Sequence, residues 1–280
     1  MFKLIENIVK NSFLGEINAL KPGNVSIYAD GHDMTMADFV KSADAATPYI
    51  CQRGATLGER VFTAVKATID AVSCNTNLGM ILLYVPLVMA AEGERSNISM
   101  LQNNTDKVLQ SVSMKDAQAV FAAIALANPG GLGKAEQYDV NFPAECSLHQ
   151  AMQLARHYDN VALQYVTRFD MIFTKGLCWL EGFVKRWNSV EWALVAIYLQ
   201  FMASYLDSHI YRKYGTETAD IIKQQSRVIF DQFIKCDEPI LFKKNLLQFD
   251  KQLKDKKINP GTSADLAAAS LLVYNLTIKK

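Results

Sequence analysis

The chain has 280 residues, half of them apolar, and a formal net charge of +1. This length is near the upper limit for one hydrophobic core, and the apolar content is sufficient to fill it. The balanced charge excludes a global attraction to nucleic acid or to an anionic membrane, so phosphate binding would need local groups. The five cysteines are scattered without a CxxC pair. This argues against a disulfide framework or a zinc site and favours a reducing, cytoplasmic location.

Apolar residues recur at helical spacing along most of the chain, and alternating strand patterns are scarce. The most apolar stretch, residues 79–91, is too short for a bilayer and contains Pro86, so it predicts a buried helix rather than a membrane span. Residues 97–107 are expected to form a polar connection. Helices are predicted at about residues 4–20, 35–46, 55–73, 78–91, 115–127, 147–157, 160–175, 190–206, 216–233, 239–254 and 263–276. The pattern predicts a single all-α domain, residues 1–280, with roughly ten or more helices around one core.

The first of four polar clusters follows the first predicted helix and comprises residues 21–24 (KPGN) and 30–33 (DGHD). Gly23 would let the backbone approach a ligand closely, and Lys21 supplies a cation. His32 and Asp33 are suited to transfer a proton or to hold a cation. An ordinary helix stop and surface loop explains the same residues, because Pro-Gly is common after a helix.

The second cluster, residues 75–79 (NTNLG), separates two apolar helices. The free backbone N–H groups at the start of the second helix favour an anion. Simple capping by Thr76 or Asn77 is the alternative, although three adjacent amide and hydroxyl side chains exceed what one cap needs.

The third cluster, residues 207–215 (DSHIYRKYG), combines a carboxylate with two cations. Arg212 offers a planar fork for phosphate, Lys213 a point charge, and Asp207 a ligand for a divalent cation. The alternative is a charged helix C-terminus that ends at Gly215.

The fourth cluster, residues 259–266 (NPGTSADL), opens the last helix. Gly261, Thr262 and Ser263 offer backbone and hydroxyl donors to a phosphate. Thr262 and Asp265 also have capping-box spacing, which explains both residues without a ligand.

Standard nucleotide and metalloprotease motifs are absent from the sequence: there is no GxxxxGK[ST], no GxGxxG after a strand and no HExxH. Residues 128–134 (NPGGLGK) are glycine-rich but follow a predicted helix. They are therefore expected to form a lid or loop rather than a nucleotide cradle.

Taken in order, KPG at 21–23, GHDM at 31–34, NTNLG at 75–79 and PGTSADL at 260–266 resemble the motifs of the all-helical triphosphoribosyl-dephospho-CoA synthase family. That family carries KPG…HxDM, NTHKG and PGGSADL segments. Residues 207–215 are similar to its D-x-x-x-x-R-x-G region, with one extra residue before the glycine. The resemblance spans nearly the whole chain.

Three segments depart from the family pattern. Asn77 and Leu78 replace the His and Lys of NTHKG, and Thr262 replaces a glycine. A central segment that is rich in Arg, Gly, Glu and Ala in the family reads GGLGKAEQYDV at residues 130–140. The chain thus looks like a divergent branch, similar to proteins encoded beside tetrahydromethanopterin and one-carbon pathway enzymes.

The resemblance implies that the 5-triphosphoribosyl group passes from ATP to a ribose hydroxyl of dephospho-CoA, or of a related cofactor precursor, with release of adenine. Mg²⁺ is the expected companion of the triphosphate. The expected catalytic residues are Asp33, Asp207 and His32, and the expected metal ligands are Asp33, Asp207 and Asp265. The expected substrate and phosphate ligands are Lys21, Gly23, Asn24, Asn75, Thr76, Asn77, Arg212, Lys213, Gly261, Thr262 and Ser263. Glu16 and Glu59 are further candidates, each on a predicted helix near a cluster.

Two other functional classes compete with this transferase. A divergent member would use a different acceptor in one-carbon cofactor biosynthesis, and a non-catalytic relative would only bind a nucleotide. A purely structural scaffold explains the caps but not four polar clusters in family order. No nucleic acid or membrane partner is expected, and the apolar composition is compatible with a homodimer.

Overall fold

A computed structural model of the chain describes residues 2–93 and 97–278. Within these ranges the backbone forms helices and no β-sheet, which confirms the predicted all-α fold. The helices are α1 (Phe2–Asn18), α2 (Met36–Ile50), α3 (Leu57–Val72), α4 (Leu78–Ala91), α5 (Ile98–Gln110), α6 (Met114–Ala127), α7 (Leu148–Ala155), α8 (Asn160–Thr167), the π-helical η1 (Met171–Gly176), α9 (Leu177–Trp187), α10 (Val190–Ser204), α11 (Ser208–Phe233), the 3₁₀-helical η2 (Pro239–Phe242), α12 (Lys243–Asp255) and α13 (Gly261–Thr277).

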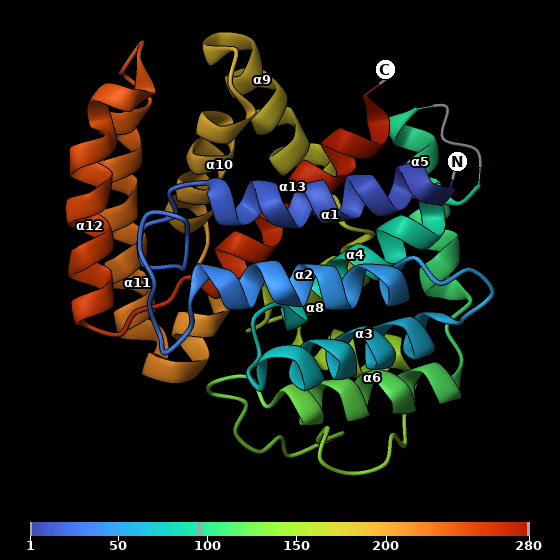
Figure 1. The fold of residues 1–280 in the computed structure, drawn as a ribbon. Helices are drawn as coiled ribbons and strands as arrows, with labels where there is room; N and C mark the ends of the chain where they lie inside the picture. Colours follow the sequence, from blue (N-terminus) through green and yellow to red (C-terminus); the bar gives the residue numbers. More distant parts are fainter. Residues whose placement is uncertain (1, 94–96, 279–280) are drawn as a thin grey trace.

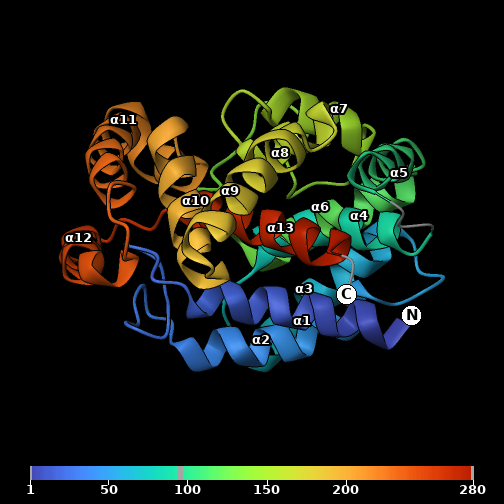
Figure 2. The same ribbon diagram turned by 90° about the horizontal axis from the view of Figure 1, so that it is seen from above.

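The helices α4, α10 and α13 form the centre of the molecule, and most of their residues are buried. Helix α13 packs against α1, α4, α9, α10 and η1 (Figures 1 and 2). A helix surrounded on all sides must be apolar on all sides, which accounts for the uniformly apolar sequences of α4 and α10. The largest cluster of buried apolar side chains runs from α1 to α13. No helix in the described ranges is long and apolar enough to cross a membrane.

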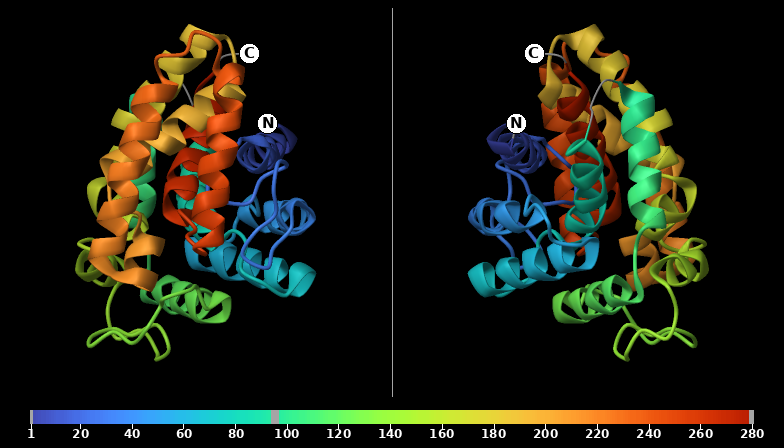
Figure 3. Two further views of the ribbon diagram at one scale, coloured as in Figure 1. Left: turned by 90° about the vertical axis from the view of Figure 1, so that its left-hand side faces the viewer. Right: turned by 90° about the vertical axis from the view of Figure 1, so that its right-hand side faces the viewer.

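The remaining helices surround this centre. Helix α2 lies between α1 and α3, and α3 packs on α6 (Figure 1). Helices α11 and α12 stand together at one edge of the molecule (Figures 1 and 2). The long loop 128–147, between α6 and α7, hangs below one end of the helical body (Figure 3).

Two helices, α5 and α9, were not predicted from the sequence, and the helix predicted at 160–175 is divided into α8 and η1. Residues 97–107, predicted to be a connection, lie largely in α5. Asn97 caps this helix, and Leu101 and Thr105, one turn apart, are its buried residues. The prediction was wrong because the exposed faces of α5 carry so many polar residues that the short apolar stripe is obscured. Helix α9 was not predicted either, although Leu177 and Leu180 are buried in the core and Trp179, Phe183, Val184 and Trp187 pack against it.

Two prolines lie inside helices. Helix α2 continues through Pro48 to Ile50, past its expected end at Ala46. Helix α4 likewise continues through Pro86. Neither proline has an N–H group to donate to the carbonyl oxygen four residues earlier, so each helix continues with one backbone hydrogen bond fewer.

The third polar cluster lies at a helix start, whereas the alternative to a ligand site had been a charged helix C-terminus. Asp207 is the N-cap of α11, and the helix extends past Gly215 to Phe233. Gly215 has a φ of 83° and interrupts the helical geometry without ending the helix. A glycine after a charged segment is typical of a C-cap, but here its left-handed conformation produces a kink between two helical parts.

Candidate active site

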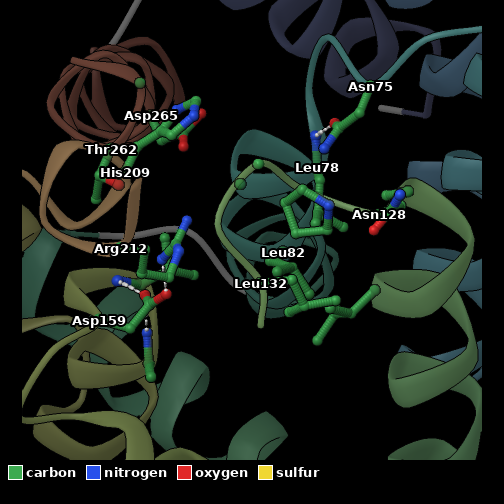
Figure 4. Close-up of a pocket in the computed structure, with 18 of the residues that line it drawn as sticks. Asn75, Leu78, Leu82, Asn128, Leu132, Asp159, His209, Arg212, Thr262 and Asp265 are labelled. Atoms are coloured by element: carbon green, nitrogen blue, oxygen red, sulfur yellow. Dashed lines mark hydrogen bonds and ion pairs between the residues drawn. The ribbon is translucent and has the colours of Figure 1, made fainter. Parts of the chain in front are cut away.

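The four polar clusters meet at one cavity of about 550 Å³. Its walls are the loop after α1, the first turn of α4, the first turns of α11 and α13, and loop 128–147 (Figure 4). The predicted site residues that line this cavity are Asn24, His32, Asp33, Asn75, Thr76, Asn77, Arg212, Lys213, Gly261, Thr262 and Asp265. The predicted residues that do not line it are Lys21, Gly23, Asp207 and Ser263, and of the two further candidates Glu16 lines it and Glu59 does not.

Lys21 is fully buried beside the cavity rather than exposed to it. Its Nζ donates a hydrogen bond to the carbonyl oxygen of Val25 at 2.6 Å and lies 2.9 Å from Oε1 of Glu16. The ammonium group therefore already has two partners and no surface to offer a phosphate. Its position supports a structural role in place of the expected phosphate contact.

Gly23 also serves the fold. Its N–H donates to Oδ1 of Asp250 at 2.8 Å, and a Cβ at this position would approach a side-chain carbon of Leu253 within 2.9 Å. Its φ of +85° is one that other residues rarely adopt. Asn24 donates to Oδ1 of Asn259 at 2.8 Å, while its own Oδ1 is buried without a hydrogen-bond partner in the described structure.

His32 and Asp33 form a tight turn at the cavity. Gly31 and Met34 exchange two backbone hydrogen bonds of 3.1 and 3.0 Å, and both central residues have left-handed φ values of 58° and 60°. Two adjacent non-glycine residues in this region are uncommon and cluster at functional sites. Asp33 is exposed at the mouth and has no hydrogen bond or ion pair with any described residue.

The His32 ring is fixed by the loop after α1. Its Nε2 lies 2.7 Å from the carbonyl oxygen of Gly23. A carbonyl oxygen only accepts, so Nε2 carries the proton and donates. Burial lowers the pKa of His32, and the positive charges of Lys254 and Lys213 lower it further. The ring is therefore neutral at neutral pH.

The first turn of α4 presents free amide groups to the cavity. Oδ1 of Asn75 accepts from the N–H of Leu78 at 3.1 Å, and the hydroxyl of Thr76 donates to Oγ of Ser42 at 2.7 Å. Asn77 makes no capping hydrogen bond, and its Nδ2 is buried without a partner among the described residues. Capping by Asn77 or Thr76 was one reading of this cluster; Asn75 takes that role instead.

Arg212 and Lys213 are the two full cations of the cavity lining. Nη1 of Arg212 forms an ion pair with Oδ2 of Asp159, and its buried Nε has no partner in the described structure. Asp159 is held in turn as the N-cap of α8 and was not identified from the sequence. A Cβ on Gly131 would lie 2.9 Å from the carbonyl carbon of Arg212, so the glycine-rich loop packs directly on this segment.

His209 is a second residue without a role assigned from the sequence. A Cβ on Gly261 would lie 2.7 Å from its Nδ1, and a Cβ on Gly130 would lie 3.3 Å from its Nε2. The imidazole thus sits between the glycine-rich loop and the first turn of α13. Burial lowers the pKa of His209, against the opposing negative charge of Asp207. Its place within the third cluster was the only signal in the sequence.

Asp207 is buried and uses both of its carboxylate oxygens within the protein. Oδ1 accepts from the N–H groups of His209 and Ile210, at 3.0 and 3.2 Å. Oδ2 accepts from the N–H and the hydroxyl of Ser263, at 2.7 and 2.8 Å. These contacts link α11 to α13. They give Asp207 and Ser263 a structural task in place of the expected catalytic, metal and phosphate roles.

Asp265 is not a cap. Helix α13 begins at Gly261 after Pro260, and no side-chain capping bond is present at this helix start. The predicted capping box of Thr262 and Asp265 is therefore wrong, because Asp265 lies in the second turn and not at the third helical position. Its side chain faces the cavity (Figure 4) and has no hydrogen bond or ion pair with any described residue.

The surroundings of Asp265 disfavour its ionised form. Burial raises the pKa of this carboxyl well above its usual value, and the negative charges of Glu16, Asp207 and Asp159 raise it further. Gly79 makes room for the group, since a Cβ there would lie 2.0 Å from Oδ2 of Asp265. Gly79 of the NTNLG segment and Asp265 of the SADL segment therefore lie in close contact, and a larger residue at position 79 would displace the carboxyl.

The two walls of the cavity differ in character. Figure 4 shows Thr262, His209 and Arg212 on one side, and Leu82 and Leu132 on the other, together with the uncharged amides of Asn75 and Asn128. Further apolar lining comes from α6, α7 and α8. The cavity therefore offers a polar half for a charged group and an apolar half for an uncharged one.

The charges of the lining are unbalanced. Five carboxyl groups line the cavity, against two full cations. No group of three or more metal-ligating side chains occurs in the described part of the chain. The carboxyls are Glu16, Asp33, Asp139, Asp159 and Asp265. Mg²⁺ commonly binds through one or two carboxylates together with substrate phosphates, and a carboxylate without a partner, such as that of Asp33, fits that mode.

A model of the ATP:dephospho-CoA triphosphoribosyl transferase family matches residues 2–280. The chain belongs to this family. Members transfer the triphosphoribosyl group of ATP to dephospho-CoA, so the protein is a transferase of coenzyme biosynthesis. The predicted family and the predicted enzyme class are both confirmed.

The fold of this family is also found in a crystal structure from Archaeoglobus fulgidus, described as a candidate triphosphoribosyl-dephospho-CoA synthase. The two chains are 23% identical and superpose with a TM-score of 0.66, over 84% of this chain and 97% of the other. No curated protein sequence gives a significant match. One of the residues that differ from the family motif NTHKG lies in the cavity wall. Leu78 occupies the position at which that motif carries a lysine.

Proposed function

We propose that the protein transfers the 5-triphosphoribosyl group of ATP to dephospho-CoA inside this cavity and releases adenine. The observation that carries the proposal is the convergence of all four family motif segments on one cavity that contains an unpartnered carboxyl, Asp265. Buried polar groups without partners are rare in proteins and need an explanation, and a bound ligand supplies one. Asn24, Asn77 and Arg212, which line the cavity, each contain such an atom.

The triphosphate would bind at the mouth, beside Lys213 and Arg212. These two residues are the full cations of the cavity lining, and the glycine-rich loop packs on their backbone. About four negative charges cannot be buried beside several carboxylates without further cations, so Mg²⁺ is expected with the substrate. Asp33 would hold the ion, and His32, as a neutral ring fixed to Gly23, would position the turn. Mg²⁺ would supply positive charge to the phosphate oxygens.

The adenosine end of ATP would then point toward Asp265 and the amides of α4. Asn75 and Asn77 border that region, and Asn77 has a free donor for a ring nitrogen. Thr262 and the first turn of α13 offer a hydroxyl and a helix N-terminus to a ribose or phosphate oxygen. The apolar half would remain for the acceptor.

A second candidate, a different acceptor from one-carbon cofactor biosynthesis, is favoured by Leu78 alone. An apolar side chain at that position removes a cation available to the acceptor in the family motif. An acceptor with fewer phosphates would suit the change. The cytoplasm remains the expected location, since the five cysteines are free. The homodimer stays a prediction for light scattering to test.

The direct test is to incubate the protein with ATP, Mg²⁺ and dephospho-CoA and to measure adenine by mass spectrometry. Adenine release that needs dephospho-CoA supports the proposed transfer. Release only with a pterin-type or other acceptor supports the second candidate. Binding of ATP without adenine from any acceptor would favour a non-catalytic nucleotide-binding protein. Reactions without Mg²⁺ and with heat-denatured protein are the controls.

A further inference from the structure

Two carboxyl groups line the same cavity, and each has an oxygen atom without a hydrogen-bond partner in the described structure. Glu16 comes from α1 and Asp265 from α13, two helices that pack against each other. Glu16 is 1% exposed and lines the cavity, yet its Oε2 has no hydrogen-bond partner in the described structure. Asp265 makes no hydrogen bond or ion pair with any described residue. A carboxyl buried only for stability would be satisfied, as Asp207 is.

The protein sets the two groups in place in different ways. Lys21 approaches Oε1 of Glu16 to 2.9 Å and is itself held by the carbonyl oxygen of Val25 at 2.6 Å. Asp265 has no such cation and rests against Gly79, where a side chain would displace it. One carboxyl therefore has a fixed positive neighbour, and the other is surrounded by negative ones.

This asymmetry decides which group carries a proton. Burial raises the pKa of both groups, but Lys21 counteracts the rise for Glu16. For Asp265, the charges of Glu16, Asp207 and Asp159 add to the rise, and only Arg212 opposes them. The ammonium group of Lys21, 2.9 Å from Glu16, favours the ionised form of Glu16, whereas the negative neighbours of Asp265 favour its protonated form.

We propose that Glu16 is the general base and Asp265 the general acid of the triphosphoribosyl transfer, an assignment that rests on the function proposed above. Glu16 accepts the proton of the acceptor hydroxyl as its oxygen bonds to C1′ of the ATP ribose. The C1′–N9 bond breaks, and its electron pair goes to adenine. Asp265 donates its proton to a ring nitrogen of the departing base. The new proton on Glu16 then passes to Asp265 and restores the starting state, so the net proton moves from acceptor to adenine.

Lys21 acts in this scheme as a positioning residue. It keeps Glu16 ionised and oriented without contact with the substrate. The KPG segment would thus contribute to the reaction through α1 and not through the triphosphate.

The test uses two isosteric variants, Glu16→Gln and Asp265→Asn, and two donors, ATP and N7-methylated ATP. The methylated base leaves as a neutral molecule and needs no proton. We expect both variants to lower kcat with ATP by about 10²- to 10⁴-fold, the usual contribution of general acid–base catalysis. The methylated donor should restore turnover in Asp265→Asn but not in Glu16→Gln. Asp44→Asn, an exposed carboxylate on α2, is the matched control and should behave as the wild type.

The outcomes separate this assignment from the proposed function. A wild-type protein that releases no adenine contradicts the function itself. An active wild type, with either variant within about threefold of it, contradicts the pair. Rescue of Glu16→Gln, or of neither variant, contradicts the division into acid and base.

A folding control keeps the test valid. If Glu16→Gln does not fold, the double variant Lys21→Met with Glu16→Gln removes both buried charges together, a change that proteins often tolerate. It should be folded by circular dichroism, inactive with either donor, and still stabilised by ATP with Mg²⁺. Turnover by this folded variant would overturn the role of Glu16.

Discussion

Two aspartates near the starts of neighbouring helices are used in opposite ways. Asp207, at the start of α11, gives all of its acceptor capacity to four hydrogen bonds within the protein. Asp265, one turn into α13, gives none and faces the cavity. Satisfied carboxylates hold helices together, whereas a half-buried carboxyl that the protein leaves unsatisfied, such as that of Asp265, is a costly feature that a ligand or a reaction would explain. The sequence ranks the two in the reverse order, because Asp207 stands beside cations and Asp265 has capping-box spacing.

The largest expected effect is on stability, at Asp207. Asp207→Ala removes the cap of α11 and leaves the N–H and hydroxyl of Ser263 without a partner. We expect a loss of about 3 kcal/mol in the free energy of unfolding, measured by urea denaturation. Asp207→Ser, the matched variant, keeps a cap and should recover about 1 kcal/mol of it. An Asp207→Ala protein that is as stable as the wild type but inactive would contradict the structural role and support a catalytic role for Asp207.

The next effect concerns the room that Gly79 provides. In Gly79→Ala, the new Cβ would overlap Oδ2 of Asp265 and displace the carboxyl. Turnover should fall on the order of 10²-fold, as for other small displacements of catalytic groups. Stability should change little, because alanine favours a helix. Gly182→Ala in α9, where a Cβ meets no neighbour, is the control and should leave turnover unchanged. Equal turnover in both variants would show that the position of Asp265 is unimportant.

The pH dependence of stability tests whether Asp265 has a raised pKa in the folded protein. A carboxyl with a raised pKa in the folded state binds its proton more tightly when folded. Its contribution to stability is therefore complete below the unfolded value near 3.8 and is lost as the pH rises through the folded pKa. Chemical denaturation from pH 4 upward should show a shallower loss in Asp265→Asn than in the wild type, by at most about 1.4 kcal/mol per pH unit. A steeper loss in Asp265→Asn would contradict the raised pKa.

The smallest effect is expected at the mouth. Lys213 is exposed, so its attraction for the triphosphate is screened by solvent. Lys213→Ala should raise the KM for ATP about fivefold, leave kcat unchanged and lose its effect at high salt. Lys66→Ala, an exposed lysine on α3, is the control. A fall in kcat in place of a rise in KM would move Lys213 into the reacting centre.

The sequence by itself determined the helical class, most helix positions and the set of polar segments that meet at the cavity. Helical spacing and helix-stop residues are local properties, and they survive in the fold because each helix must bury its apolar face. The ordered motifs also identified the family. Failures came where local signals were weak or ambiguous, as in the polar α5 and at the kinked Gly215.

Only the tertiary structure decided which charged side chains face the cavity. Lys21 is fully buried in the fold although its two partners, Glu16 and Val25, are close in sequence, and Asp207 binds Ser263 across 56 positions. Glu16 and Asp265 lie near opposite ends of the chain and meet because α1 packs on α13. Such partners are set by long-range packing, and the same residue type is structural or available for chemistry according to whether packing satisfies its hydrogen bonds.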